Sequence, residues 1–183
     1  MIRKITLMIA AFMMLMPIGV LAASGVGEEI PHDLALKNQS GEVQNFEQIT
    51  GEKGVVLVFV RSADWCPYCQ VQLLDLRREG GQRITDLGYN IATVSYDAPE
   101  QLKAFSDKYS FEHMMLSDEG SEAIKAFGIL NEDFATDHFA FGVPHPHVFV
   151  VNRSKVIQAV LSEEGYKKRP QIDAIVEAIG GSR

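Results

Sequence analysis

The stretch GVVLVFVRSADWCPYC, residues 54–69, decides the fold of this chain. Its first seven residues are apolar and rich in β-branched side chains, which is typical of a strand buried on both faces of a sheet. Pro67 directly follows Cys66, and proline is favoured in the first turn of a helix because the amides of that turn have no intrahelical partner. The sequence therefore predicts a central strand that leads through a short loop into a helix.

The rest of the chain alternates between strand-like and helix-like segments. A turn signal inside residues 33–46 predicts a small hairpin, and the helix that follows Cys66 is expected to run to Gly88. The remaining expected elements are strands at 89–96 and 113–118, helices at 99–109 and 121–128, a strand pair at 143–152 and 155–161, and a helix within 169–181. This order predicts an α/β domain with a mixed sheet.

Residues 1–22 have the layout of a secretory signal peptide. Arg3 and Lys4 precede an apolar run of roughly sixteen residues, shorter than the about 20 that a membrane-spanning helix needs. Val20 and Ala22 suit the positions that a signal peptidase reads. We therefore expect cleavage after Ala22 and a periplasmic or secreted protein, with an uncleaved membrane anchor as the alternative.

The sequence is acidic, with a net charge of −7. Loss of residues 1–22 would remove two cations and no acid, so the mature chain is more negative still. Binding to nucleic acid needs a basic face, and we therefore expect no nucleic-acid partner. Residues 23–183 are long enough to close one core without staples, and two cysteines do not make a disulfide scaffold.

Cys66 and Cys69 are the only cysteines of the chain, and their spacing favours a redox centre. A cysteine at the beginning of a helix lies beside unpaired amides and the positive end of the helix dipole, which stabilise its thiolate. A cysteine three residues later lies on the same face, within reach of a disulfide. We expect Cys66 to be the nucleophile and Cys69 the resolving thiol, with Trp65 and Tyr68 as an apolar rim.

Two other roles for the cysteine pair are weighed against this one. A structural disulfide that closes a loop of about four residues removes little entropy from the denatured state, so it is the weaker alternative. A zinc site would need two more ligands, and His145 and His147 do not have zinc-finger spacing. Copper held by two thiolates and a histidine is chemically better suited. We expect a site without a metal or another cofactor, and a copper-binding module is the alternative from another class.

The chain resembles the thioredoxin-like superfamily and, within it, the redoxin branch that holds alkyl hydroperoxide reductase and thiol-specific antioxidant (AhpC/TSA) proteins. The resemblance covers residues 27–69, 142–152 and 165–179, and its most specific motif is W-C-P-Y-C after an apolar strand. It implies a thioredoxin-like fold over residues 23–183, in which a central mixed sheet is flanked by helices.

The resemblance also implies roles for residues around the cysteines. In the superfamily a cis-proline lies beside the dithiol, and counting back three residues from Phe149 assigns this place to Pro146, with Pro144 as the other candidate. His145 would then face the cysteines and could hydrogen-bond a thiolate. A rigid loop of trans prolines with solvated histidines is the alternative. Asp64 could serve in part as a nearby base, and Arg61 could stabilise the charge of a thiolate.

Four family positions differ in this chain. Peroxiredoxins carry Thr three residues and Pro seven residues before the peroxidatic cysteine, where this chain has Ala63 and Phe59. Thioredoxin carries a buried carboxylate where this chain has Val60, and the arginine that polarises a peroxide has no evident match at His145. The sequence therefore favours a thiol–disulfide oxidoreductase. A thiol-dependent peroxidase is the nearest alternative, and a copper chaperone similar to Sco proteins is the alternative from another class.

The expected partners follow from this chemistry. They are the thiols or disulfides of other proteins and, in an oxidising compartment, a membrane electron donor that supplies thiol equivalents. Hydroperoxide is the substrate of the peroxidase alternative.

Overall fold

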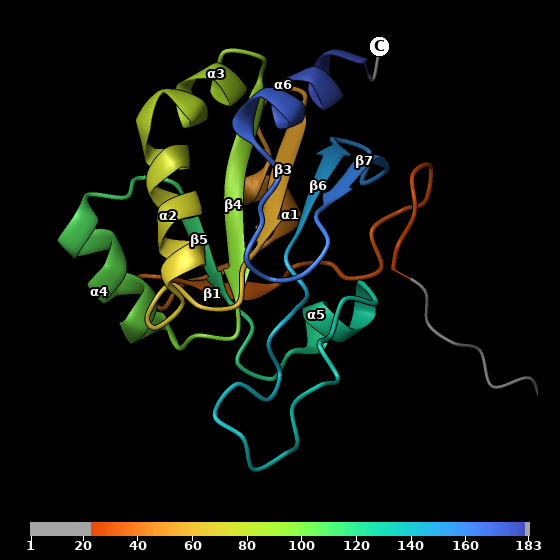
Figure 1. Ribbon diagram of the computed structural model, residues 1–183. Helices are drawn as coiled ribbons and strands as arrows, with labels where there is room; N and C mark the ends of the chain where they lie inside the picture. Colours follow the sequence, from red (N-terminus) through yellow and green to blue (C-terminus); the bar gives the residue numbers. More distant parts are fainter. Residues whose placement is uncertain (1–22, 182–183) are drawn as a thin grey trace, which may run out of the picture.

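The computed structural model describes residues 23–181, so the expected signal peptide at residues 1–22 lies outside the described residues. Seven strands of the described chain form one mixed sheet in the order β2-β1-β5-β4-β3-β6-β7 (Figure 1). The strands are β1 (Leu36–Asn38), β2 (Val43–Gln44), β3 (Gly54–Phe59), β4 (Tyr89–Ser95), β5 (Met114–Ser117), β6 (His147–Asn152) and β7 (Ile157–Ser162).

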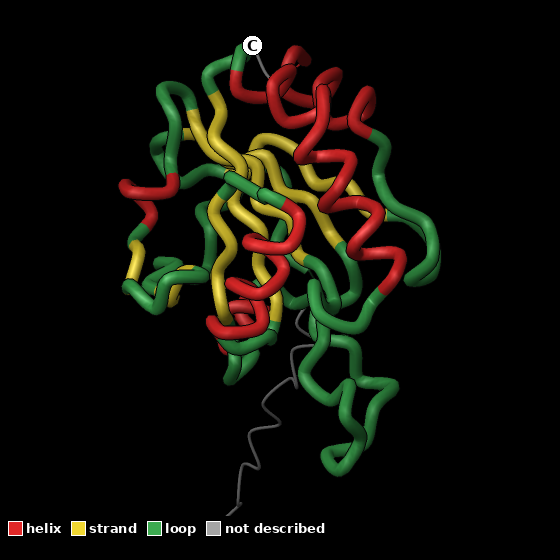
Figure 2. The backbone as a smooth tube through the Cα atoms, turned by 90° about the vertical axis from the view of Figure 1, so that its left-hand side faces the viewer, coloured by secondary structure: helices red, strands yellow, loops and turns green. Residues whose placement is uncertain are grey.

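Helices cover both faces of this sheet, which confirms the expected thioredoxin-like α/β fold (Figure 2). One face carries α2 (Pro67–Asp75), α3 (Gly81–Thr85), α4 (Pro99–Tyr109) and α6 (Ile172–Gly181). The other face carries α1 (Phe46–Ile49) and α5 (Glu122–Ala126). Within residues 23–181, no helix combines the length and the apolar character needed to cross a bilayer.

Strand β3 lies at the centre of the sheet, as its sequence predicts. All six of its residues are buried, and it pairs in parallel with β4 and antiparallel to β6. Alternate residues face opposite layers, so Val56 and Val58 join the core under α2 while Leu57 and Phe59 join the core on the other face. The strand therefore delivers the residues that follow it, 60–66, to the beginning of α2.

The helix expected to run from Cys66 to Gly88 is interrupted. A π-helical segment, η1 (Leu76–Gly80), separates α2 from α3, and Arg78 within it has non-helical angles (φ −80°, ψ −144°). Two consecutive glycines at the junction weaken the helix. His113 reaches the same place, with its Nε2 atom 3.2 Å from the carbonyl oxygen of Leu76. A side chain at Gly81 would collide with His113, so the close contact between the helix and the residue before β5 requires glycine at this position.

Two smaller differences from the expected elements are an additional short helix and a later beginning of the last helix. Helix α1, which the sequence analysis does not predict, begins after Asn45 and is stabilised by a capping box in which Asn45 and Gln48 bond each other's backbone amides. Helix α6 begins at Ile172 rather than beside Pro170. Residues 163–171 are consequently an irregular segment, and this segment becomes part of the site.

Three phenylalanines hold together the core on the α1 and α5 face. Phe59 of β3 contacts Phe127 and Phe149, with ring centroids 4.8 Å and 5.7 Å away, and Phe127 and Phe149 are 5.0 Å apart. All three side chains are fully buried. The cluster joins β3 and β6 to the end of α5, and so fixes the strand that leads to the cysteines.

Replacing Phe149 with alanine is expected to lower the free energy of unfolding by about 3–5 kcal/mol, because it leaves a cavity among rings that cannot close over it. Urea unfolding followed by circular dichroism measures the change. Val43→Ala, at an exposed site in β2, is the matched control and should change stability by no more than about 0.5 kcal/mol. Equal effects for the two variants would contradict this account of the core.

Candidate active site

The two cysteines form a disulfide at the beginning of α2. Cys66 is the N-cap of the helix, Pro67 is its first residue, and the Cα atoms of Cys66 and Cys69 are 5.2 Å apart. The backbone amides of Cys69 and Gln70 both donate to the carbonyl oxygen of Cys66, each at 3.0 Å. The first turn thus holds the two sulfurs on one face, in the geometry that the spacing predicts.

Both cysteines are buried, with 1% of Cys66 and none of Cys69 exposed. They belong to the core that includes Ala63 and Leu73, beneath the helices of that face. A reactant therefore reaches the sulfur atoms only after a covering group moves. Burial of the sulfur atoms therefore restricts which molecules can react with the disulfide, and the sequence does not predict this restriction.

The covering group is Arg169, which the sequence analysis misses. Its Nη2 atom lies 3.2 Å from Sγ of Cys69 and 4.0 Å from Sγ of Cys66. Its Nη1 atom donates to the carbonyl oxygens of Lys168, at 2.8 Å, and Tyr166. Arg169 is only 8% exposed although it follows two lysines in a run that is typical of a solvated surface. Its position before Pro170, in the irregular segment ahead of α6, is the only sequence signal that sets it apart.

Arg61 is also buried, and its guanidinium lies among aromatic rings rather than against sulfur. It is 4.4 Å from the ring centroid of Tyr166, 5.0 Å from that of Trp65 and 5.5 Å from that of Phe134. Burial lowers the pKa of Arg61, and the nearby tyrosines partly oppose that effect. The guanidinium of Arg61 is thus held by cation–π contacts, and its expected effect on a thiolate stays a prediction.

The two arginines make the site electropositive. Burial, together with a smaller effect of the nearby charge of Arg61, lowers the pKa of Arg169 to about 10. Among the described residues, neither guanidinium forms an ion pair with a carboxylate. A buried cation without a counterion favours a negative charge beside it, so the reduced cysteines should hold a thiolate.

Asp97 holds the loop between β3 and Cys66. Its carboxylate accepts hydrogen bonds from the backbone amide of Ala63 (2.7 Å) and from the hydroxyls of Ser62 (2.7 Å) and Ser95 (2.8 Å). Burial raises the pKa of Asp97, and these hydrogen bonds oppose the rise. The residue comes from the end of β4, the strand beside β3, so the sheet itself sets the position of the loop.

Ser62, which is bonded to Asp97, restrains the residues before Cys66 in turn. Its Oγ atom accepts from the backbone amides of Asp64 (3.0 Å) and Trp65 (3.2 Å). The carboxylate of Asp64 is exposed and accepts from Nε2 of Gln101 at 3.0 Å. Asp64 therefore fixes the loop to α4, and its role as a nearby base stays a prediction.

The expected aromatic rim is present. The Nε1 atom of Trp65 donates to the hydroxyl of Tyr96 at 2.9 Å, and that hydroxyl donates to the carbonyl oxygen of Phe139 at 2.9 Å. The rings of Trp65 and Phe139 are 5.1 Å apart. Tyr68, 40% exposed, packs against Tyr166 on the other side. The rim is apolar and open to solvent at Phe139, which is 69% exposed.

The expectation of a cis-proline at Pro146 is wrong, because the described residues contain no cis peptide bond. The segment before β6 is extended: Leu130 and Pro144 form an isolated bridge, and the amide of His145 donates to the carbonyl oxygen of Ile129 at 2.7 Å. These contacts are compatible with the ordinary trans form, which most X–Pro bonds adopt. The side chain of His145 is exposed, and the contact with the sulfurs that was expected of it is made by Arg169.

The copper alternative would require a third ligand beside the cysteines. Within residues 23–181, no group of three or more His, Cys, Asp or Glu side chains is placed to hold a metal ion. His147, the second histidine of the PHPH segment, forms a hydrogen bond of 2.9 Å between its Nδ1 atom and the carbonyl oxygen of His145. The described residues thus offer no assembled copper site.

Comparisons with known proteins agree with this geometry. The family model described as AhpC/TSA family matches residues 26–160. Peroxiredoxin Q, chloroplastic, of Sedum lineare is 26% identical over 149 residues, which are 81% of this chain and 75% of that protein. Peroxiredoxin Bcp of Escherichia coli (strain K12) is 30% identical over 104 residues, which are 57% of this chain and 65% of that protein. Other chloroplast relatives are matched over 58–66% of their length.

Solved structures show the same fold. Peroxidoxin BcpB from Mycobacterium tuberculosis superposes with a TM-score of 0.69 at 19% identity, over 86% of this chain and 95% of that one. A thiol peroxidase from Chromobacterium violaceum superposes with a TM-score of 0.71 at 15% identity, over 87% and 88% of the two chains.

Arg169→Met is expected to raise the apparent pKa of the more acidic thiol in the reduced protein by about one to two units, because it removes the cation that stabilises the thiolate. The pH dependence of alkylation by iodoacetamide measures this pKa. Arg169→Lys should retain part of the effect, and Arg153→Met, at an exposed site, is the control that should leave the pKa unchanged. An unaltered profile in Arg169→Met would rule out this role for the guanidinium.

Asp97→Ala is expected to cost about 2–4 kcal/mol of stability, because it leaves the buried amide of Ala63 without its acceptor. Since burial raises the pKa of Asp97, folding favours the protonated carboxyl. The difference in stability from wild type should therefore be largest below about pH 4 and shrink as the pH rises through the folded-state pKa. Urea unfolding across this range is the measurement. Asp107→Ala, which removes an exposed ion pair with Lys103, is the control and should cost less than about 1 kcal/mol.

Proposed function

The chain belongs to the AhpC/TSA family, and we propose that it is a thiol-dependent peroxidase in which Cys66 reduces a hydroperoxide and Cys69 resolves the product. The observation that carries the proposal is the Cys66–Cys69 disulfide with the guanidinium of Arg169 against both sulfurs. The relatives named peroxiredoxin support the same reaction class.

In the first step the thiolate of Cys66 attacks one oxygen of the hydroperoxide. A sulfur–oxygen bond forms, the oxygen–oxygen bond breaks, and the leaving alkoxide takes up a proton and departs as an alcohol. Cys66 becomes a sulfenic acid and is thereby oxidised by two electrons. The positive end of α2 and the charge of Arg169 stabilise the attacking thiolate, and Arg169 is placed to stabilise the negative charge that develops on oxygen.

In the second step the thiol of Cys69 attacks the sulfur of the sulfenic acid. A disulfide forms and water leaves, which regenerates the bond seen in the structure. Because both cysteines lie in the first turn of α2, with their Cα atoms 5.2 Å apart, the step needs no unfolding of the helix. An external dithiol must then reduce the disulfide to restore the enzyme.

The sequence favours disulfide exchange with other proteins, on the ground that Ala63 and Phe59 replace two peroxiredoxin residues. The comparisons support the peroxidase alternative better, and Arg169 supplies the guanidinium that the sequence analysis does not find. Burial of both sulfurs also favours a small oxidant, since a hydroperoxide needs less displacement of Arg169 than a folded protein does. Exchange of disulfides remains part of the cycle as its reductive half.

The proposed compartment is the periplasm or the exterior. The charged start, the apolar run and the small residues within residues 1–22 support secretion. In such a compartment the reductant would draw on a membrane electron donor, because glutathione and thioredoxin do not keep thiols reduced there.

Single-turnover oxidation of the reduced protein tests the reaction. Trp65 is the sole tryptophan and adjoins Cys66, so its fluorescence can report the oxidation by hydrogen peroxide or cumene hydroperoxide. A free thiol is about 3% ionised at pH 7, so full ionisation alone accelerates the reaction about 30-fold. We expect a larger rate constant, because Arg169 also stabilises the transition state.

Two variants assign the roles in the same assay. Cys66→Ser should lose the reaction, and Cys69→Ser should keep the first step but stop at a sulfenic acid that dimedone traps and mass spectrometry detects. A rate constant in the wild type no more than about 30-fold above that of free cysteine would exclude a peroxidase, because ionisation alone explains it.

A further inference from the structure

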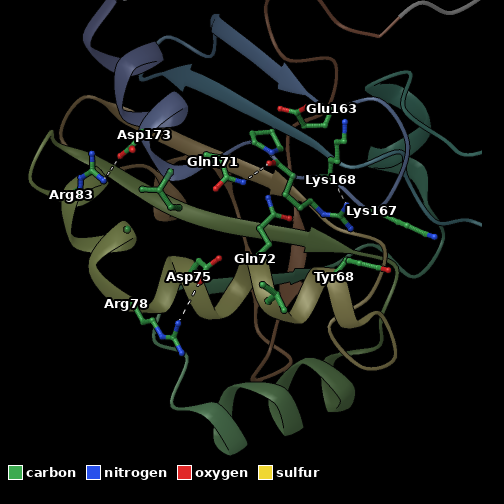
Figure 3. Close-up of a pocket in the computed structure, with 15 residues that line it drawn as sticks. Tyr68, Gln72, Asp75, Arg78, Arg83, Glu163, Lys167, Lys168, Gln171 and Asp173 are labelled. Carbon is green, nitrogen blue, oxygen red and sulfur yellow. Dashed lines mark hydrogen bonds and ion pairs between the residues drawn. The ribbon is translucent and has the colours of Figure 1, made fainter.

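A groove of about 870 Å³ lies between α2 and residues 163–173 (Figure 3), and Arg169, which lines it, contacts the disulfide. Tyr68, Val71 and Gln72 of α2 line one wall, and Lys168, Arg169 and Ile172 belong to the opposite side. A water molecule occupies about 30 Å³ in the liquid, so the groove is far larger than hydrogen peroxide requires. Val71 is 59% exposed and Tyr68 is 40% exposed, which leaves apolar surface open along the groove.

The groove is basic although the chain as a whole is acidic. Lys167, Lys168 and Arg169 line it consecutively, whereas the complete sequence has a net charge of −7. Glu163 is the acidic group that faces them from the same segment. The groove therefore attracts negative charge in a protein that elsewhere repels it.

The other acidic residues of the groove are already paired. Asp173 lies 2.7 Å from a guanidinium nitrogen of Arg83, and Asp75 lies 3.7 Å from one of Arg78. Figure 3 shows both pairs at the end of the groove away from Tyr68. The cations nearer the disulfide are thus the ones without a carboxylate partner among the described residues.

Two residues that line the groove each carry a buried polar atom without a hydrogen-bond partner. Oε1 of Gln72 accepts no hydrogen bond and Nε of Arg169 donates none, although these residues are only 6% and 8% exposed. Gln72 extends from α2 toward the segment that carries Gln171 (Figure 3). A peptide unit offers one donor and one acceptor, which is the pair that these two atoms lack.

We propose that this groove docks an extended, acidic segment of the protein that reduces the Cys66–Cys69 disulfide. The proposal rests on the proposed function, because the cycle requires a dithiol reductant. Backbone groups of the segment would bond Gln72 and Arg169, its acidic side chains would pair with Lys167 and Lys168, and its apolar side chains would cover Tyr68.

Docking also explains how a buried disulfide is reached. Arg169 lines the groove and lies 3.2 Å from Sγ of Cys69, so it separates the groove from the sulfurs. A carboxylate in the groove gives Arg169 the counterion that it lacks and draws its guanidinium away from the disulfide. Binding of the acidic segment and exposure of the sulfurs are thereby coupled.

Reduction of the disulfide then proceeds by two successive thiol–disulfide exchanges. A thiolate of the partner attacks the sulfur of Cys66, a bond forms between the two proteins, and Cys69 leaves as a thiolate beside the cationic segment. The second thiol of the partner attacks the partner's own sulfur in this mixed disulfide and releases Cys66. The partner loses two electrons and becomes a disulfide. Of its two thiol protons, one is taken up by the reduced cysteine pair and the other passes to the solvent, because that pair holds one thiolate.

Two synthetic dithiol peptides test the proposal, one with glutamates flanking a Cys-x-x-Cys sequence and one with lysines in the same places. Each reduces the oxidised protein in a quenched-flow experiment in which mass spectrometry counts alkylated thiols, and dithiothreitol serves as the uncharged reference. In the wild type the acidic peptide should react faster than the basic peptide, and added salt should narrow the difference.

The variant Lys167→Glu/Lys168→Glu reverses the charge of the groove at two exposed positions. The ratio of the acidic-peptide rate to the dithiothreitol rate should fall about tenfold. Lys37→Glu/Lys108→Glu changes the net charge equally at exposed sites outside the groove and should leave the ratio unaltered.

Equal rates for the two peptides in the wild type, or equal losses in the two variants, would overturn the proposal. The measurements begin from the disulfide and use no hydroperoxide, so failure of docking is distinguished from failure of the peroxidase reaction.

Discussion

The contact between Arg169 and the two sulfur atoms is the interaction on which the site depends. It joins residues that are 100 and 103 positions apart in the chain. The β6–β7 pair extends the sheet beyond β3, and α6 returns across the face that carries α2, so the segment between β7 and α6 must pass over the beginning of α2. The hydrogen bonds from Arg169 to backbone carbonyls of its own segment then hold the guanidinium in place. The site is thus formed by two segments that are distant in the sequence, the cysteine motif after β3 and the segment between β7 and α6.

This arrangement links the charge of the site to its redox state. In the disulfide form, the buried guanidiniums of Arg61 and Arg169 have no carboxylate partner among the described residues, and they contact aromatic rings, carbonyl oxygens and the neutral sulfur atoms instead. Reduction creates a thiolate beside Arg169, which supplies the missing negative charge. The reduced form is therefore stabilised relative to the disulfide, and stabilising the reduced form raises the reduction potential. The same guanidinium that activates the thiolate makes the disulfide easier to reduce.

Local patterns in the sequence account for the parts of the structure that were predicted correctly. The apolar run of residues 54–60 and the proline after Cys66 specify a buried strand and a helix start, because both depend on burial and backbone geometry within a few residues. Arg169 and Asp97 could not be predicted in this way, because the site residues that they contact lie far away in the sequence. Ala63 is 34 positions from Asp97 and Cys69 is 100 positions from Arg169, and the sequence around each residue resembles a solvated loop. The expected cis form of Pro146 came from the family resemblance, whereas the described residues contain no cis peptide bond and the segment before β6 is extended.

Because the disulfide is buried, the oxidative and reductive halves of the proposed cycle need different degrees of access to the sulfur atoms. The oxidant is a small molecule, whereas the reductant is a protein. A hydroperoxide is small, and the thiolate that it meets is already stabilised, so oxidation needs only a small displacement near Cys66. Reduction brings a second protein to a sulfur that is at most 1% exposed, and this requires Arg169 to leave its place. The cations of the groove that lie nearer the disulfide have no carboxylate partner among the described residues, and they give that larger reactant the means to move the guanidinium. The residues that protect the disulfide from stray thiols are thus the residues through which a specific reductant gains access.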